Sequence, residues 1–306
     1  MIEQTEATFN LVDEPWIRVR TVSGETTELS LIDVFAHAHE LTTLANDIPT
    51  QDFAILRMML AVLQRAVLPM SEDYENPTEL WKDLWKAETL PIGAIDAYLQ
   101  AWYKRFDLFD IEAPFMQVAG LEATSGRITE IRKLVADVPD RKLLFSLRSG
   151  RGLAALSFDE AARWLIHIQT FDTAGIKTGV KGDLAAKDGK SHSKGTGWSG
   201  RLGGVYLEGD TLMRTLLLNL VLCDDVSGDD YECFFGEDDL PVWEQPPQQP
   251  GNSGRQPCGT ADIYTWQSRR VRLAAGNSLV TGVILSVGDS VDSFNKFGLE
   301  PMVVSN

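Results

Sequence analysis

The chain has 306 residues, 44% of them hydrophobic, so it can bury a core in one large domain or two modest ones. Its formal net charge of −16 argues against a free-standing nucleic-acid binder, because attraction to phosphates needs a basic face. The three cysteines have no CxxC or zinc-ribbon spacing, residues 1–8 have no apolar signal core, and the strongly apolar stretches are far shorter than the roughly 20 residues of a membrane span. We therefore expect a soluble cytoplasmic protein with reduced thiols and no membrane contact.

Hydrophobic spacing predicts the elements of the first half. Residues 9–21 and 26–31 flank a Ser-Gly turn and predict an N-terminal hairpin. Apolar residues at helical spacing follow the cap candidate Thr50 and stop at Pro69, which predicts a core helix of about five turns. Two further amphipathic helices are expected, one on either side of Pro91.

The second half predicts further helices and a pair of strands. A capping box that begins at Ser157 predicts one helix, and Asp210 is the expected cap of another that runs to residue 221. Residues 264–273 and 279–287 predict two strands joined by a Gly-Asn turn. The chain as a whole is thus expected to be an α+β protein.

Residues 174–204 form a basic island in this acidic chain. They carry nine glycines, and six lysine or arginine side chains stand against two aspartates. Glycines let a backbone approach a partner closely, and the flanking Lys190, Lys194 and Arg201 are suited to hold phosphates on either side. Gly195 begins a GxGxxG spacing, but no helix follows it, so a dinucleotide site is not expected. From composition alone, a plain flexible loop is favoured over nucleic-acid contact.

Residues 224–258, first acidic and then rich in Pro and Gln, predict an exposed and mobile excursion. The carboxylates of 224–239 resemble in type those of metal-dependent nucleases, but a two-metal site needs carboxylates fixed by rigid elements, so a solvated loop is favoured. The four histidines supply no catalytic set. We therefore expect no enzyme activity, no metal and no cofactor.

Four segments in chain order carry a family resemblance. They read NLVDEPWIRV at 10–19, FDIEAPFMQV at 109–118, KGTGWSGRLGG at 194–204, and EGD at 208–210 leading into TLLLNL at 215–220. Residues 264–267, YTWQ, follow the variable acidic and proline-rich region. In this order the segments resemble the CasA family, the large subunits of type I-E CRISPR Cascade complexes.

The resemblance implies that 1–306 form a mixed helical and β N-terminal domain that checks duplex DNA for the protospacer-adjacent motif. It also implies that a glycine loop of this domain enters the minor groove. By position, Gly195 to Gly197 would be that loop, within the DNA-contact stretch 174–204, and the segment 145–148 would dock near the 5′ end of the guide RNA. The expected DNA-binding residues are Lys177, Lys181, Lys190, Lys194, Gly195, Thr196, Gly197 and Arg201. The expected guide-docking residues are Phe145, Ser146 and Arg148.

The resemblance also implies partners. These are the other Cascade subunits, the CRISPR RNA, target double-stranded DNA, and a separate helicase-nuclease that cuts the DNA. We find no counterpart of the family's strand-splitting hairpin or C-terminal helical bundle before residue 306, so a domain without that bundle is expected. Two alternatives remain: a metal-dependent nuclease that uses 224–239, and a purely structural scaffold subunit.

Overall fold

The computed structural model describes residues 7–138, 154–192, 195–222, 238–276, 278–291 and 296–303. The helices are α1 (Leu31–Ala36), α2 (Pro49–Val67), α3 (Pro77–Lys86), α4 (Ile92–Ala101), α5 (Phe158–Phe171), α6 (Leu212–Asn219) and α7 (Thr260–Tyr264). The strands are β1 (Ile17–Thr21), β2 (Thr26–Leu29), β3 (Leu41–Leu44), β4 (Thr129–Glu130), β5 (Ile176–Thr178), β6 (Lys190–His192), β7 (Arg269–Ala275) and β8 (Val280–Val287). Short 3-10 turns lie at Leu68–Asp73, Tyr103–Phe106 and Ile131–Lys133.

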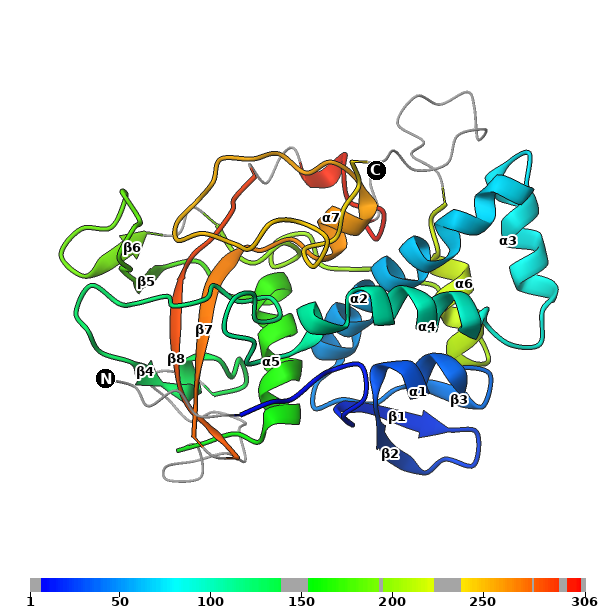
Figure 1. The fold of residues 1–306 in the computed structure, drawn as a ribbon, viewed down its shortest axis with the longest axis horizontal. Coiled ribbons are helices and arrows are strands. Elements are labelled where there is room, and N and C mark those ends of the chain that lie inside the picture. The colour runs from blue at the N-terminus through cyan, green and yellow to red at the C-terminus, as the bar shows by residue number, and fades with distance from the viewer. Residues whose placement is uncertain are drawn as a thin grey trace.

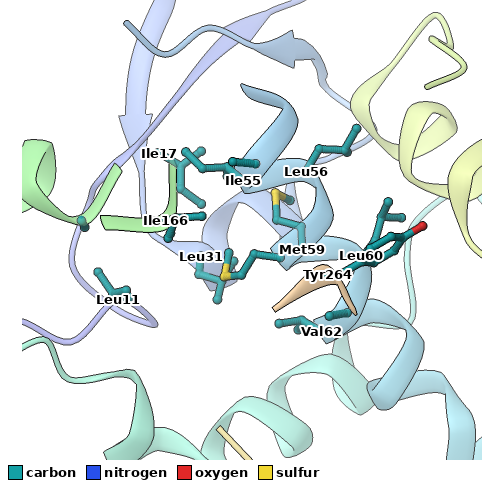
Figure 2. Packing of buried hydrophobic residues seen from close by; sticks show 14 of the residues in the cluster. Leu11, Ile17, Leu31, Ile55, Leu56, Met59, Leu60, Val62, Ile166 and Tyr264 are labelled. Atoms are coloured by element: carbon teal, nitrogen blue, oxygen red, sulfur yellow. The ribbon is translucent and has the colours of Figure 1, made fainter. Parts of the chain in front are cut away.

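Helix α2 is the centre of the core. It contacts α4, α5, α6 and α7, and its side chains are buried almost all round, which is typical of a core helix. Figure 2 shows Ile55, Leu56 and Met59 of α2 among apolar side chains from other elements, including Ile17 and Ile166. By length and composition, residues 49–73 are apolar enough to cross a membrane, but 78% of their most apolar window is buried inside the fold.

Within the described residues, the strands form three small antiparallel sheets. The strand orders are β2-β1-β3, β4-β8-β7 and β5-β6. In Figure 1 the β2-β1-β3 sheet and the long β7-β8 hairpin lie at different sides of the molecule, with α2 and α5 between them, and β5-β6 lies at the outer edge beyond β8. The expected N-terminal hairpin is confirmed as β1 and β2.

Two expected caps are wrong, and a third holds only in position. Pro49 occupies the first turn of α2 and Ile48 precedes it, so Thr50 is not the cap; proline has no N–H to lose there. Thr211, and not Asp210, accepts the N–H of Arg214 at 3.2 Å and caps α6, which ends at Asn219. Ser157 does precede α5, although its side chain makes no capping hydrogen bond.

The strand expected over 264–273 begins only at residue 269, because the chain before it forms α7. The Asp239 carboxylate accepts the N–H groups of Ala261 and Asp262 at 3.0 and 2.9 Å, which satisfies the exposed amides at the start of that helix. A residue more than twenty positions away thus caps this helix. No local pattern shows such a cap.

The prediction of an exposed, mobile excursion over 224–258 is wrong for part of its described portion. Asp239, Val242 and Trp243 are buried, and the Trp243 indole donates to the Tyr98 hydroxyl at 2.7 Å. The Trp243 ring also lies 4.9 Å from that of Phe106, centroid to centroid. One buried tryptophan therefore anchors a stretch whose composition predicts solvent exposure. Residues 224–237 lie outside the described part of the chain.

Candidate nucleic-acid interface

The described part of 174–204 is folded, so it is not the plain flexible loop that its composition favours. β5 and β6 pair in the register Ile176 to His192, and the amide of Lys181 donates to the Glu122 carbonyl at 2.9 Å. A side chain at Gly179 would meet the backbone of Gly189 at 2.7 Å, so that glycine is required by the close pairing of the hairpin. The basic island therefore rests on a fixed scaffold.

The loop at 195–204, called the glycine loop below, is fastened to the end of α5. The N–H groups of Gly197, Trp198 and Ser199 donate to carbonyls at 172, 169 and 170, over 2.7, 3.0 and 2.8 Å. A helix leaves its last carbonyls without intrahelical partners, and here the loop supplies them. Helix α5 therefore sets the conformation of the loop.

The two central glycines of this loop have different surroundings. A Cβ at Gly197 would lie 2.5 Å from the backbone of Thr170, so this glycine is required by packing against α5. A Cβ at Gly195 would meet no atom within 4 Å. Gly200 and Gly204 are also packed, against Thr196 and Phe53. Both central glycines were expected to face DNA, and only Gly195 has open space in front of it.

Lys177, an expected phosphate contact, is turned inward. Its ammonium lies 2.5 Å from the Asp172 carboxylate, its side chain is only 10% exposed, and burial lowers its pKa. The same carboxylate pairs with the Arg269 guanidinium, which also donates to the Gly195 carbonyl at 2.9 Å. Lys177 thus helps to fix the base of the glycine loop, and its paired, mostly buried ammonium is less available to DNA than that of an exposed lysine.

The other expected contacts differ in their availability. Lys181 is exposed but pairs with Glu122 at 2.5 Å, and this pairing lowers the pKa of Glu122. Lys190 and Arg201 are exposed, and neither has an ion-pair partner within the described residues. Thr196 is half-buried and donates to the Gly197 carbonyl at 3.0 Å. The remaining expected residues, Lys194, Phe145, Ser146 and Arg148, lie outside the described residues.

Sequence reasoning missed two residues that hold the loop, Arg269 and Glu300. Glu300 accepts the indole N–H of Trp198 at 2.5 Å, and Arg269 holds the carbonyl of Gly195. Both lie about 75 to 100 positions from their partners, so no spacing rule connects them. Charged residues are rarely fully buried unless they are paired, so burial of Arg269 and Glu300 points to a structural role. That burial is known only from the structure.

The expected absence of a metal site concerns mainly 224–239, of which two residues are described. Asp239 is buried, where it caps α7 and accepts the side-chain amide of Gln64 at 2.9 Å. Across the described ranges no group of three or more His, Cys, Asp or Glu side chains is arranged to hold a metal ion. Asp239 is thus committed to structure, which removes one ligand from the nuclease alternative.

Comparison with known proteins identifies the family. The family model for CRISPR-associated protein Cse1 matches residues 10–306. The chain belongs to the Cse1 family. Within that family, the CRISPR-associated protein CasA/Cse1 of Thermus thermophilus is 30% identical over 305 residues, which cover 96% of this chain and 54% of that protein. The resemblance to CasA is thereby confirmed.

Solved Cse1 structures confirm the α+β fold. Cse1 of Thermobifida fusca is 41% identical with a TM-score of 0.83, over 93% of this chain and 52% of that one. Cse1 of Acidimicrobium ferrooxidans is 37% identical with a TM-score of 0.81, over 97% and 54%. A chain of a CRISPR RNA-guided surveillance complex in a pre-nicking state shares the fold at 20% identity and a TM-score of 0.74, over 96% and 57%. This chain spans about half the length of these relatives.

Proposed function

We propose that this chain is a non-catalytic subunit of a type I-E CRISPR RNA-guided surveillance complex. It recognises the protospacer-adjacent motif of invading duplex DNA through the glycine loop and supports recruitment of the helicase-nuclease. The observation that carries the proposal is the open space before Gly195, on a loop whose next glycine is packed against α5. A side-chain-free backbone on a fixed support is suited to a close approach to DNA.

The chemistry fits a shallow reading of the minor groove. That groove is about 6 Å wide and shows a degenerate pattern, in which A·T and T·A look alike and G·C adds one amino donor. Backbone contact there gives permissive recognition, so we expect several related motifs to be accepted. Lys190 and Arg201 are available to contact the flanking phosphates.

An acidic chain can contact DNA when it acts as one subunit of a larger complex. Base pairing with the guide RNA reads most of the target, so the protein needs to read only a short duplex signal. The CRISPR RNA and the other Cascade subunits hold the chain near DNA, which raises the effective concentration of the loop and offsets the net charge of −16. We place this complex in the cytoplasm and assign cutting to the helicase-nuclease.

The decisive variant is Gly195→Asp, which adds bulk and a negative charge where we place the groove. Gly93→Asp is the matched control, since Gly93 in α4 also has open space around its Cβ position. We expect Gly195→Asp to weaken binding of motif-bearing duplex by the assembled complex at least about 100-fold, comparable to two good base contacts. The melting temperature and assembly should be unchanged, and Gly93→Asp should behave as the parent chain in every assay.

Near-normal affinity of the Gly195→Asp complex for motif-bearing DNA would refute the minor-groove assignment and favour a purely structural subunit. A joint fall of melting temperature, assembly and affinity would indicate a glycine needed for the fold alone. Mg²⁺- or Mn²⁺-dependent cutting of labelled duplex by the purified chain would contradict the non-catalytic role.

A further inference from the structure

Trp198, in the middle of the glycine loop, points into the protein and is held there by residues 296–303. Its ring is almost fully buried, and its indole N–H donates to Glu300 at 2.5 Å. Its backbone carbonyl accepts from the Lys296 ammonium at 3.2 Å, and the same ammonium lies 4.9 Å from the centroid of the indole ring. The indole N–H and the backbone carbonyl of Trp198 are therefore both hydrogen-bonded to a segment about 100 positions away.

The Glu300 carboxylate joins three parts of the fold. Its side chain is completely buried; one oxygen pairs with the Arg57 guanidinium of α2 and accepts the N–H of Met302 at 3.0 Å. The other oxygen accepts the Trp198 indole. A buried carboxylate is stable only when paired and hydrogen-bonded, so displacement of the indole would leave a buried acceptor without its partner. The position of Trp198 is fixed for this reason.

A second contact fixes the loop on the other side of Thr196. The Arg269 guanidinium, itself paired with Asp172, donates to the Gly195 carbonyl at 2.9 Å. Gly195, which faces open space, is thus held through its own carbonyl and lies three residues from the buried Trp198. A segment fixed before it binds has less conformational entropy to lose on binding.

We infer that Glu300, acting through Trp198, is a positioning residue that holds the glycine loop in its DNA-reading conformation. The inference rests on the proposed function of that loop. The Glu300 side chain is fully buried, so it cannot contact DNA itself and would act on DNA through the loop. Loss of the link should loosen the loop and weaken motif binding, although the surface offered to DNA is unchanged.

Trp198→Phe tests the link because it removes the indole N–H, keeps an aromatic ring and leaves the Arg57–Glu300 pair in place. Trp266→Phe is the matched control. Trp266 is the other member of the same ring pair, with centroids 5.5 Å apart, and its indole donates to the Asp289 carbonyl at 3.1 Å, not to the loop. Both variants remove one buried indole donor, but only Trp198→Phe removes a hydrogen bond that holds the glycine loop.

The first measurement is amide hydrogen exchange of residues 197–200 in the 306-residue chain. We expect exchange at least about tenfold faster in Trp198→Phe, and within about twofold of the parent in Trp266→Phe, because only the first removes a loop attachment. Unchanged exchange in Trp198→Phe, or equal acceleration in both, would overturn the inference. If Trp198→Phe does not fold, Glu300→Gln keeps the shape of the side chain and should accelerate exchange at the same amides.

The second measurement is affinity of the assembled complex for motif-bearing duplex, with Gly195→Asp measured alongside. We expect about tenfold weaker binding for Trp198→Phe and parental binding for Trp266→Phe, since only the former loosens the loop. If loop exchange is faster in Trp198→Phe, but Trp198→Phe and Gly195→Asp both bind DNA with parental affinity, the DNA role of the loop is refuted and the structural link stands. Loss of binding in Gly195→Asp without faster exchange in Trp198→Phe would refute the link and leave the DNA role.

Discussion

At the scale of single residues, the surroundings decide what each glycine and lysine of the basic island does. Gly195 faces open space, whereas a Cβ at Gly197 would meet the backbone of Thr170 at 2.5 Å. Lys177 is buried in an ion pair, whereas Lys190 is exposed. Residues of one type, a few positions apart, thus divide into those that build the loop and those that are available to a partner.

Gly197→Ala should lower the free energy of unfolding by about 1–3 kcal/mol, because the new methyl group must displace the backbone at the end of α5. Gly195→Ala, in open space, should change it by less than about 0.5 kcal/mol. Denaturant unfolding of the two variants gives both values. Equal destabilisation would show that the loop does not pack against α5 as described.

Lys190→Ala should weaken DNA binding by the complex about equally with and without the motif, and should make the salt dependence shallower by about one unit of slope. A lysine is a point charge without base-edge geometry, so it contributes affinity and not selectivity. Lys177→Ala should instead reduce thermal stability, because it leaves Asp172 with Arg269 as its remaining cation. Titrations at several salt concentrations measure the first effect, and loss of binding at one motif alone would show that Lys190 reads bases.

At the scale of elements, α5 has two tasks. Its apolar face packs on α2, and its last carbonyls bind the glycine loop. His167, on the same helix, is buried, and its ring nitrogen Nε2 lies 3.0 Å from the hydroxyl oxygen of Thr50 in α2. The contact between α2 and α5 therefore includes a group that titrates near neutral pH when it is exposed.

This contact should make stability pH-dependent. Burial lowers the pKa of His167 from 6.5 to about 4, so between these values the unfolded chain binds a proton that the folded chain does not. Burial of the neutral His167 therefore costs no stability above about pH 6.5. As the pH falls from 6.5 toward 4, the free energy of unfolding decreases by up to about 3 kcal/mol. Unfolding free energies at pH 7 and pH 4.5 should differ less in His167→Gln than in the parent, while His192→Gln, at an exposed site, should match the parent.

At the scale of the whole molecule, the charge of −16 opposes long-range attraction to DNA, and the exposed cations of the basic island act only locally. Several other cationic side chains lie inside the fold and are not exposed to solvent. Arg57, Arg163 and Arg270 are fully buried, and each pairs with a carboxylate. These three side chains therefore add nothing to the basic surface that the described residues offer a duplex.

The isolated chain should accordingly bind DNA weakly and with little selectivity, with a dissociation constant above about 1 μM at physiological salt. Fluorescence anisotropy of a labelled duplex, with and without the motif, measures this, and the assembled complex provides the comparison. Submicromolar binding by the chain alone would mean that its local basic surface outweighs its net charge.

The sequence by itself located helices α2 to α6 and determined the family. Apolar periodicity located α2, α3, α4 and α5, because a helix that buries one face must repeat apolar residues along it. The glycine loop was located by its own residues. The tertiary structure alone decided which glycine faces outward, which lysines are free, and that Asp239, Arg269 and Glu300 hold elements far from them in the chain. Periodicity is local, whereas caps, ion pairs and close backbone contacts join residues up to about 240 positions apart, so they exist only once the chain is folded.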